Sequence, residues 1–302
     1  MKRMKISKSN WLQIGLLLLV IGLLSILINN IIVNLYNTGL GFNYSWLLRP
    51  ASFALAEHSL PFSPSDSYAW ALFIGWLNSL KVIFASLFIA TFIGFFVGIA
   101  RIGTNILLNL ISTGYITIIR QTPLLLQLMF WYFVGFLGLK DKAIAPLRGI
   151  LSISNQGINL LGINLSAEFS ALLLGLSVFT GAYIAEVVRG GINSVPRGQW
   201  EAFKSLGLSD IHGLYKIIIP QALPAIIPGL TSQYLNLAKN STLAIAIGYA
   251  DIYAVNDTII NQTGRAIECF ILLLLSFLFL NIIISSLMEM VNKLILSTRI
   301  NY

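Results

Sequence analysis

The sequence predicts an all-α fold, a polytopic membrane bundle of about six transmembrane helices with both termini in the cytoplasm. Of its 302 residues, 57% are hydrophobic and only 10% are charged, whereas a soluble domain carries about 25% charged residues. So few charges cannot cover a surface exposed to water, and the chain is therefore an integral membrane protein. Long apolar stretches supply the helices, and an unequal distribution of lysine and arginine supplies their orientation.

The first predicted span covers residues 11–33 and follows a basic N-terminus. This arrangement resembles a signal peptide. However, the run "LQIGLLLLVIGLLSILI" exceeds the roughly 7–15 apolar residues of a signal, and no small-residue cleavage site follows it closely. We therefore expect a retained helix. Three prolines among polar residues in 34–73 predict an external linker, which completes an N-terminal unit over 1–73.

Five further stretches have the length of about 20 apolar residues that crosses the hydrocarbon core as a helix. They are predicted at 74–100, 115–137, 168–188, 221–247 and 267–290. They define a membrane domain over 74–292 and leave 293–302 as a cytoplasmic tail.

Orientation follows from the loop cations, because cytoplasmic loops carry an excess of lysine and arginine. With six spans, twelve of these residues fall on one side, namely Lys2, Arg3, Lys5, Lys8, Arg101, Arg120, Arg189, Arg197, Lys204, Lys216, Lys293 and Arg299. Five fall on the other side, namely Arg49, Lys140, Lys142, Arg148 and Arg265. This imbalance predicts that both termini lie in the cytoplasm. The cations at 140–148 run counter to it, because they form a basic cluster on the other side. The imbalance also explains the net charge of +8 without nucleic-acid binding.

The longest predicted cytoplasmic loop contains an unusually polar stretch, "RGQWEAFKSLGLSDIHGLYKIIIP". Pro196 suits the start of a helix and Gly207 suits its end. Apolar residues recur every three positions between them, which predicts a short amphipathic helix. A second short helix is expected to follow, with Ser209 as its cap. Composition leaves open whether the first helix lies on the bilayer or docks to a partner.

This loop resembles the one that marks permease subunits of ABC importers. In that family the loop reads Glu-Ala-Ala, three residues, Gly, nine residues, Ile, one residue, Leu-Pro. The residues at the matching positions here are Glu201, Ala202, Phe203, Gly207, Ile217, Ile219 and Pro220. Phe203 stands for the second alanine and Ile219 for the leucine, and both substitutions keep apolar character.

A second segment resembles the polar-amino-acid branch of these permeases, in which Arg-Gly-Thr-Pro-Leu-Leu-x-Gln is typical. Residues 120–127 read Arg-Gln-Thr-Pro-Leu-Leu-Leu-Gln. Gln121 in place of glycine is similar to the general L-amino-acid permeases. The stretches "GAYIAEVVRGGINSVPRGQWEA" and "KNSTLAIAIGYADI" fit the same branch. The resemblance covers 74–292 and implies a five-helix type I importer domain there, with one added N-terminal helix.

The resemblance implies a bacterial inner-membrane transport subunit that catalyses no reaction and binds no cofactor itself. ATP and Mg belong to a partner ATPase, and this chain has no Gly-x-x-x-x-Gly-Lys-Ser/Thr run of its own. The implied partners are two ATPase subunits, a second permease that is different or identical, an external amino-acid-binding protein and membrane lipid.

The implied ATPase-coupling positions are Glu201, Ala202, Phe203, Gly207 and Pro220. Glu201 can pair with a basic residue of the partner, Ala202 permits close approach and Gly207 makes the turn. Phe203 is expected to fill a pocket in one particular partner.

Polar residues within spans are candidates for the substrate path. Ser232, Asn236, Lys239 and Asn240 follow one helical face, which cannot face lipid. Lys239 can attract an amino-acid carboxylate, or the face can instead form helix–helix hydrogen bonds with the lysine reaching outward.

Three residues near the third span join these substrate-path candidates, namely Arg120, Thr122 and Gln127. For Arg120 an interfacial anchor is the competing interpretation, and Thr122 is expected to cap a helix that Pro123 starts or kinks. Glu186 and Arg189 are three positions apart, and this spacing predicts an ion pair on the surface of a helix.

The predicted function is import of polar, neutral or general L-amino acids, driven by a separate ATPase, with alternating access. The alternative is an ion-coupled secondary transporter of small solutes. Such transporters place acidic residues at mid-membrane, often in paired repeats. No Asp or Glu falls clearly at mid-span here and no repeat is visible, which favours the importer.

Overall fold

Helices long enough to cross a membrane dominate the structure, a computed structural model that describes residues 8–37, 43–139, 144–147 and 150–300. Within these residues, five segments have the length and apolar character of a span, and a bent pair supplies a possible sixth. The five are α1 (Lys8–Asn37), α2 (Tyr68–Ala100), α5 (Ala167–Asn193), the run Asp210–Ile247 and α10 (Ala266–Ile300). The spans predicted at 11–33, 74–100, 168–188, 221–247 and 267–290 are confirmed as helical.

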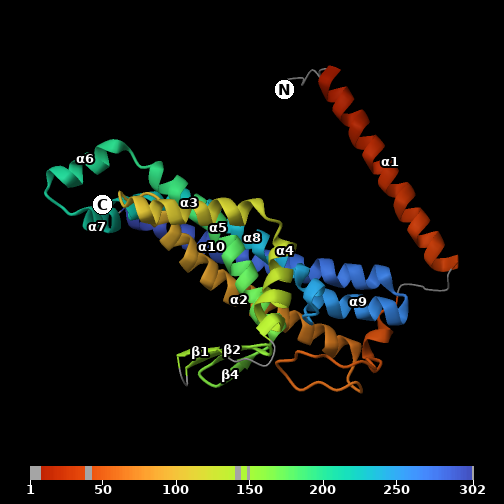
Figure 1. Cartoon of the computed structure of the whole chain (residues 1–302). Coiled ribbons are helices and arrows are strands. Elements are labelled where there is room, and N and C mark those ends of the chain that lie inside the picture. Colours follow the sequence, from red (N-terminus) through yellow and green to blue (C-terminus); the bar gives the residue numbers. More distant parts are fainter. Residues whose placement is uncertain (1–7, 38–42, 140–143, 148–149, 301–302) are drawn as a thin grey trace.

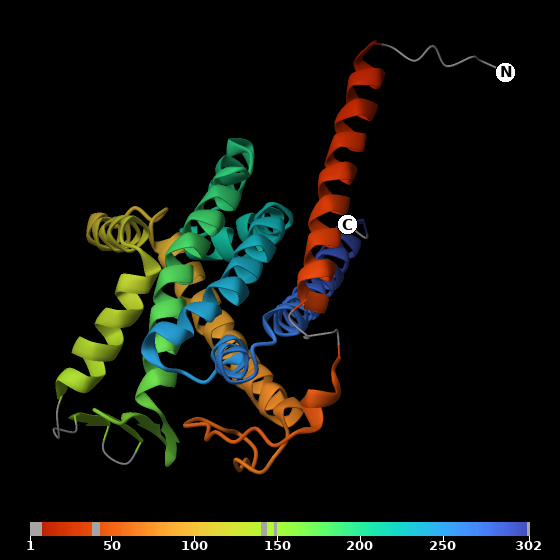
Figure 2. The same cartoon turned by 90° about the vertical axis from the view of Figure 1, so that its right-hand side faces the viewer.

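The third predicted span is not the single continuous helix expected over 115–137. It consists of α3 (Ile106–Gln121) and a second helical part that joins α4 (Leu124–Met129) to the π-helical η2 (Phe130–Phe136) and the short η3 (Leu137–Leu139). The two parts meet at an angle of 105°, so that Figure 2 shows α3 end-on beside the long axis of α5.

The bend has a local cause at Thr122 and Pro123. A proline disfavours helical backbone in the residue before it and lacks an N–H for the helical ladder, and Thr122 is accordingly extended. The prediction that Thr122 caps the second helix is wrong. Its hydroxyl donates to the Ile118 carbonyl at 2.8 Å, so it closes the end of α3 instead.

A small antiparallel sheet, which the sequence analysis did not predict, connects η3 to α5 (Figure 1). Its order is β1 (Ile144–Leu147), β2 (Leu151–Ser154), β3 (Gly157–Leu160) and β4 (Ile163–Leu165). Leu161 and Gly162, both at positive φ, connect β3 to β4, as a type I′ turn requires. Figures 1 and 2 place this sheet at one end of the bundle, which we call the sheet end, and α6 (Arg197–Ser205) at the other, the α6 end.

The sheet end also holds residues 43–67, which are packed rather than a loose linker. Trp46 and Ala51 are buried in a cluster with Tyr68, Val255 and Cys269, contributed by η1 (Ser45–Leu48), α2, α9 (Ile252–Thr263) and α10. By contrast, α1 exposes its apolar side chains along its whole length, as expected of a lipid-facing helix.

The loop cations follow the predicted division where the structure describes them. Arg101, Arg120 and Arg189 gather at the α6 end, and Arg49 and Arg265 line a pocket at the sheet end. Lys2, Arg3, Lys5, Lys140, Lys142 and Arg148 lie outside the described residues, as do the side chains of Lys8 and Arg299. Which end faces the cytoplasm stays a prediction from the charges.

Glycines allow α2 and α5 to pack backbone against backbone. A Cβ added at Gly98 would lie 2.8 Å from the Ala185 carbonyl oxygen, and one at Gly94 would overlap the Ile184 side chain. From the other helix, a Cβ at Gly181 would lie 2.9 Å from Cγ2 of Ile93. Small residues are the usual means of close helix contact in membranes, where no hydrophobic effect drives helices together.

Replacing Gly94 by alanine is therefore expected to destabilise the chain by about 1–3 kcal/mol, the typical cost of overpacking. The measurement is the thermal unfolding midpoint of the purified protein in detergent. Gly114→Ala in α3 is the matched control, because a Cβ there meets nothing within 4 Å. Equal midpoints for the two variants would contradict a close α2–α5 contact.

Candidate functional site

The polar loop forms a projecting element at the α6 end (Figure 1), with a helix between Pro196 and Gly207 as predicted. Helix α6 runs from Arg197 to Ser205 directly after Pro196. Gly207 has φ +71 and donates to the Lys204 carbonyl, while the next residue, Leu208, donates to Phe203. These two bonds are those of the Schellman motif, in which a left-handed glycine satisfies the last carbonyls of a helix.

The expected second short helix is not a separate unit. Helix α7 (Asp210–Gly213) continues through the π-helical η4 (Leu214–Ile218) into α8 (Ile219–Asn240). Ser209 occupies the cap position but makes no capping bond; its hydroxyl pairs with Nδ1 of His212 at 2.8 Å. The loop thus consists of one projecting helix followed directly by the start of the next span.

Phe203 holds α6 against this span. Its side chain is only 1% exposed, it meets Trp200 at a ring distance of 5.9 Å, and a Cβ on Gly213 would overlap its ring. The Gln221 side-chain amide donates to Gln199 at 3.0 Å and adds a polar link between the two helices. The expectation that Phe203 fills a partner's pocket is therefore wrong, because its ring is buried within its own chain.

The surface of the loop carries both the predicted positions and three exposed apolar side chains that were not predicted as contact residues. Glu201, Ala202, Gly207 and Pro220 are all exposed. Around them Leu206, Ile211 and Tyr215 are 75%, 79% and 72% exposed. Large apolar side chains so exposed on a polar loop are typical of a partner-binding surface. The available signal was that Leu206 directly precedes Gly207 and that Ile211 and Tyr215 follow it within the same polar loop.

The carboxylate of Glu186 joins three helices near the same end. It pairs with Arg189 at 2.9 Å as predicted, and also with Arg120 at 3.5 Å and with Arg101. Arg101 follows α2, Arg120 lies in α3, and Glu186 lies in α5. The Arg120 guanidinium further lies 5.0 Å from the centre of the Tyr183 ring. These contacts place Arg120 in an interhelical ion cluster.

Gln127 lies at the bend between α3 and α4. Its side-chain amide donates to the carbonyls of Ile119 at 2.9 Å and Thr122 at 3.1 Å. Carbonyls at a helix end have no partner in the helix itself and need one elsewhere when buried. Gln127 supplies it and so stabilises the bend.

The polar face predicted on α8 exists and is accessible. Ser232, Asn236 and Lys239 are exposed and Asn240 is half-buried. Lys239 lines a polar pocket of about 330 Å³ with α10, whose lining includes Asn281, Ser285, Ser286 and Glu289. Asn281 contributes a buried carbonyl oxygen without a partner among the described residues. The face thus combines a cation with hydroxyl and amide groups.

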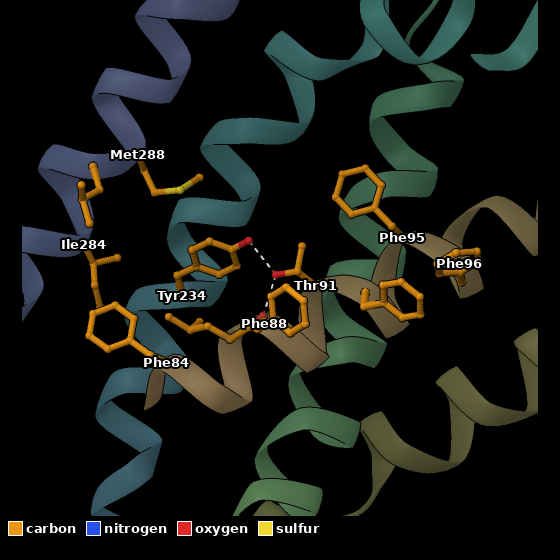
Figure 3. A pocket seen from close by; sticks show the side chains of 11 residues that line it. Phe84, Phe88, Thr91, Phe95, Phe96, Tyr234, Ile284 and Met288 are labelled. Carbon is orange, nitrogen blue, oxygen red and sulfur yellow. Dashed lines mark hydrogen bonds between the residues drawn. The ribbon is translucent and has the colours of Figure 1, made fainter. Parts of the chain in front are cut away.

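A larger groove beside this face is apolar. Figure 3 shows it between α2, α8 and α10, lined by phenylalanines of α2 with Ile284 and Met288. Its volume is about 560 Å³. Its polar contact is the 2.6 Å bond between the hydroxyls of Thr91 and Tyr234. Such a lining suits lipid or a neighbouring helix.

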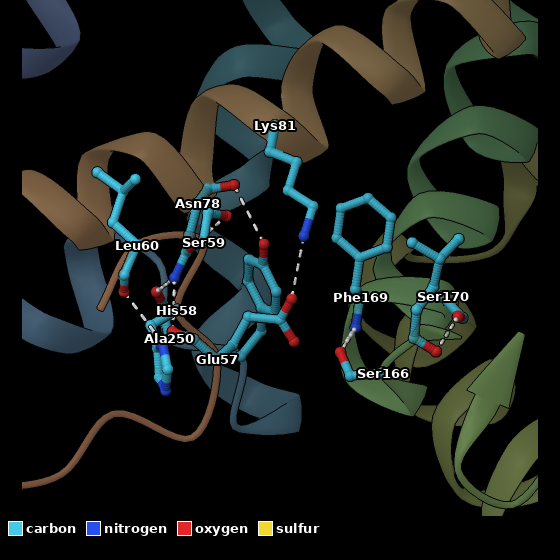
Figure 4. A network of polar contacts seen from close by, with 12 residues as sticks. Glu57, His58, Ser59, Leu60, Asn78, Lys81, Ser166, Phe169, Ser170 and Ala250 are labelled. Atoms are coloured by element: carbon cyan, nitrogen blue, oxygen red, sulfur yellow. Dashed lines mark hydrogen bonds and ion pairs between the residues drawn. The ribbon is translucent and has the colours of Figure 1, made fainter. Parts of the chain in front are cut away.

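The sheet end is closed by a polar network centred on Asn78 of α2 (Figure 4). Its side-chain amide donates at 2.9 Å to the carbonyls of both Glu57 and Ala250. Lys81 pairs with Glu57 at 3.2 Å and lies 4.8 Å from the centre of the Phe169 ring. The network therefore joins residues 43–67, α2, α5 and the segment before α9.

Asp251, in that segment, caps α9 by accepting from the Ala254 amide at 2.8 Å. Its other oxygen has no partner among the described residues, and burial raises the pKa of the carboxyl to about 7. An ion cluster around Glu186, an exposed loop and a polar face on α8 thus occur in one chain of helices long enough to span a membrane. Together these features indicate a membrane-embedded transport protein.

Comparisons with known proteins agree with this class. Residues 90–297 match the family described as binding-protein-dependent transport system inner membrane component. The putative amino-acid ABC transporter permease protein YhdX of Escherichia coli is 35% identical, with 94% of this chain and 93% of YhdX covered. The general L-amino acid transport system permease protein AapQ of Rhizobium johnstonii is 32% identical, with 94% and 91% covered.

Solved structures give the same fold. A crystal structure of an amino acid ABC transporter with histidines aligns with a TM-score of 0.59 at 28% identity, covering 75% of this chain and 94% of that one. An inward-facing MetNI methionine ABC transporter aligns with a TM-score of 0.58, and at 19% identity it supports the fold alone.

The chain belongs to the binding-protein-dependent transport system inner membrane component family. It is a multi-pass inner-membrane permease subunit of an ABC importer rather than an enzyme, and its ATPase is a separate subunit. The relatives are ABC permeases, and they give no support to an ion-coupled secondary transporter.

The raised pKa of Asp251 predicts a pH dependence of stability. Burial favours the neutral carboxyl in the folded state. The contribution of Asp251 to the free energy of unfolding is therefore complete below the unfolded pKa of about 4 and is lost as the pH rises towards the folded pKa of about 7. Asp251→Asn keeps a capping oxygen and removes the charge. We expect it to raise the unfolding midpoint at pH 8 but not at pH 4, with Asp257→Asn, an exposed position, as control. A pH-independent difference would contradict this prediction.

Proposed function

We propose that this subunit carries polar, neutral or general L-amino acids inward. It would pair with a second permease, different or identical, above two ATPase subunits that hold ATP and Mg. An external amino-acid-binding protein would deliver the substrate. The proposal is supported by the matches to amino-acid permeases over nearly the whole chain and by the exposed loop around Gly207. A binding screen on the associated external protein would identify the amino acid.

The loop surface is proposed as the ATPase contact. Its apolar residues Leu206, Ile211 and Tyr215 would become buried in the partner, at about 25 cal/mol for each Å² of apolar surface removed from water. Glu201 beside them would pair with a basic residue. The Schellman turn at Gly207 fixes the direction in which this surface leaves α6.

Motion of α6 would pass directly to α8. Phe203 packs against Gly213, Gln199 bonds to Gln221, and no loop intervenes between α7 and α8. An ATPase that moves α6 would therefore move α8 as a rigid body, together with the polar face that lies farther along it.

That polar face is the proposed wall of the substrate path. Lys239 is its cation, and an amino-acid carboxylate is the group it would attract. Ser232 and Asn236 share the exposed face and can offer hydrogen bonds. Arg120, Thr122 and Gln127 make contacts with neighbouring residues of the chain, so we assign the α8 face, rather than these three, the closest approach to substrate.

Gly207→Val is expected to abolish ATP-driven uptake in proteoliposomes while the protein still inserts. A β-branched residue resists φ near +71, so the turn and the loop surface would be lost. Gly264→Val is the matched control, because Gly264 has φ +69 and open space around it but lies at the end of α9. Uptake that survives Gly207→Val, or fails equally in both variants, would refute the coupling assignment.

Lys239→Met tests the substrate path and keeps most of the side-chain length. We expect the uptake KM to rise about tenfold or more, as for the loss of a charged partner worth about 1.5–3 kcal/mol. ATPase activity without substrate should remain. Lys293→Met removes another exposed cation, near the C-terminal end of α10, as control. Unchanged uptake and substrate choice in Lys239→Met would exclude the carboxylate role.

A further inference from the structure

A second polar pocket lies at the sheet end, away from both the loop and the α8 face. Its volume is about 490 Å³, and its lining includes Trp46, Arg49, Tyr68, Gln262 and Arg265. Trp46 belongs to the short helix η1, and Arg265 separates α9 from α10. The pocket therefore joins the packed N-terminal segment to the membrane domain.

Its depth in the membrane follows from the two spans that begin beside it. Tyr68 is the first residue of one span, and Arg265 directly precedes the other at Ala266. Just inside, Trp70, Phe73 and Trp76 stack along α2 at ring distances of 5.4 and 6.3 Å. Stacked tryptophans at the end of a span are typical of the membrane interface, so the pocket lies at the level of lipid headgroups.

The pocket carries one uncompensated positive charge. Arg265 pairs with the buried Glu268 at 2.9 Å, which balances its charge. Arg49 is exposed and makes no ion pair with any described residue. The lining contains no Asp or Glu. A single anionic group would fit this arrangement, whereas the ammonium of a free amino acid would find no carboxylate there.

An unsatisfied donor points to the same kind of ligand. Trp46 is 2% exposed, and its Nε1–H has no acceptor in the part of the chain that the structure describes. Leaving a buried donor unpaired costs about 1–3 kcal/mol. The ring of Tyr68 lies 5.7 Å away, but its hydroxyl, which donates to Gln262 at 3.0 Å, does not accept from the indole. Trp46 lines the pocket, so ligand binding that turns its ring towards the cavity would let an anionic oxygen accept from the indole.

We propose that this pocket binds the phosphate of an anionic phospholipid headgroup. The exposed Leu48, next to Arg49 and 80% accessible, would meet the acyl region. Arginine binds phosphate oxygens through paired N–H groups. The bound lipid would tie residues 43–67 to the start of α10.

Native mass spectrometry of the full-length chain, purified with its partner subunits, tests this proposal. Delipidated protein is titrated with phosphatidylglycerol or phosphatidylcholine. We expect one phosphatidylglycerol adduct that binds about tenfold more weakly in Arg49→Gln, and several-fold more weakly in Trp46→Phe, which removes only the donor. Lys293→Gln, a cation at the other end of α10, should bind as the wild type.

Three outcomes would overturn the proposal. The first is equal phosphatidylglycerol binding by the wild type, Arg49→Gln and Trp46→Phe. The second is equal affinity for the two lipids. The third is full competition by millimolar inorganic phosphate, which would identify a site for free anions. Unfolding midpoints of all variants without lipid separate a lost ligand from a lost fold, because the Arg49 and Trp46 variants should lose only the stabilisation that phosphatidylglycerol adds.

Discussion

The close contact between α2 and α5 is the constraint on which the other features depend. Gly94, Gly98 and Gly181 bring the two backbones together, and the contact between α2 and α5 is the most extensive between any two elements described. In a membrane this contact has to come from shape, because lipid tails are as apolar as the helices. With α2 and α5 fixed, Asn78 can form its hydrogen bonds at the sheet end and Glu186 can form its ion pairs at the α6 end.

The two ends of the α2–α5 pair are stabilised by different kinds of contact. At the α6 end, Glu186 collects arginines from three chain segments, and Phe203 joins α6 to the start of α8. At the sheet end, Asn78 joins backbone carbonyls from residues 43–67 and from the segment before α9. A force applied at α6 therefore meets a short rigid connection to α8, while the opposite end is held by buried hydrogen bonds.

The sequence predicted the spans and the polar loop that contains α6 because both depend on local rules. Apolar length identifies a span, and Pro196 and Gly207 bound α6 through backbone preferences that need no tertiary contact. The sheet over 144–165 was missed because its strands are only three or four residues long. Its turn at Leu161 and Gly162 requires positive φ in leucine, which sequence rules do not anticipate.

The sequence by itself determined the membrane class, the helical spans, the place and turn of the polar loop that contains α6, and the family resemblance. Tertiary structure alone decided that Phe203 points inward, that the chain bends by 105° at Pro123, and that three arginines share Glu186. It also decided that Trp46 and Arg49 meet Arg265 in one pocket. The physical reason is that periodicity and backbone preference act within a few residues, whereas burial and charge pairing join residues that are far apart along the chain.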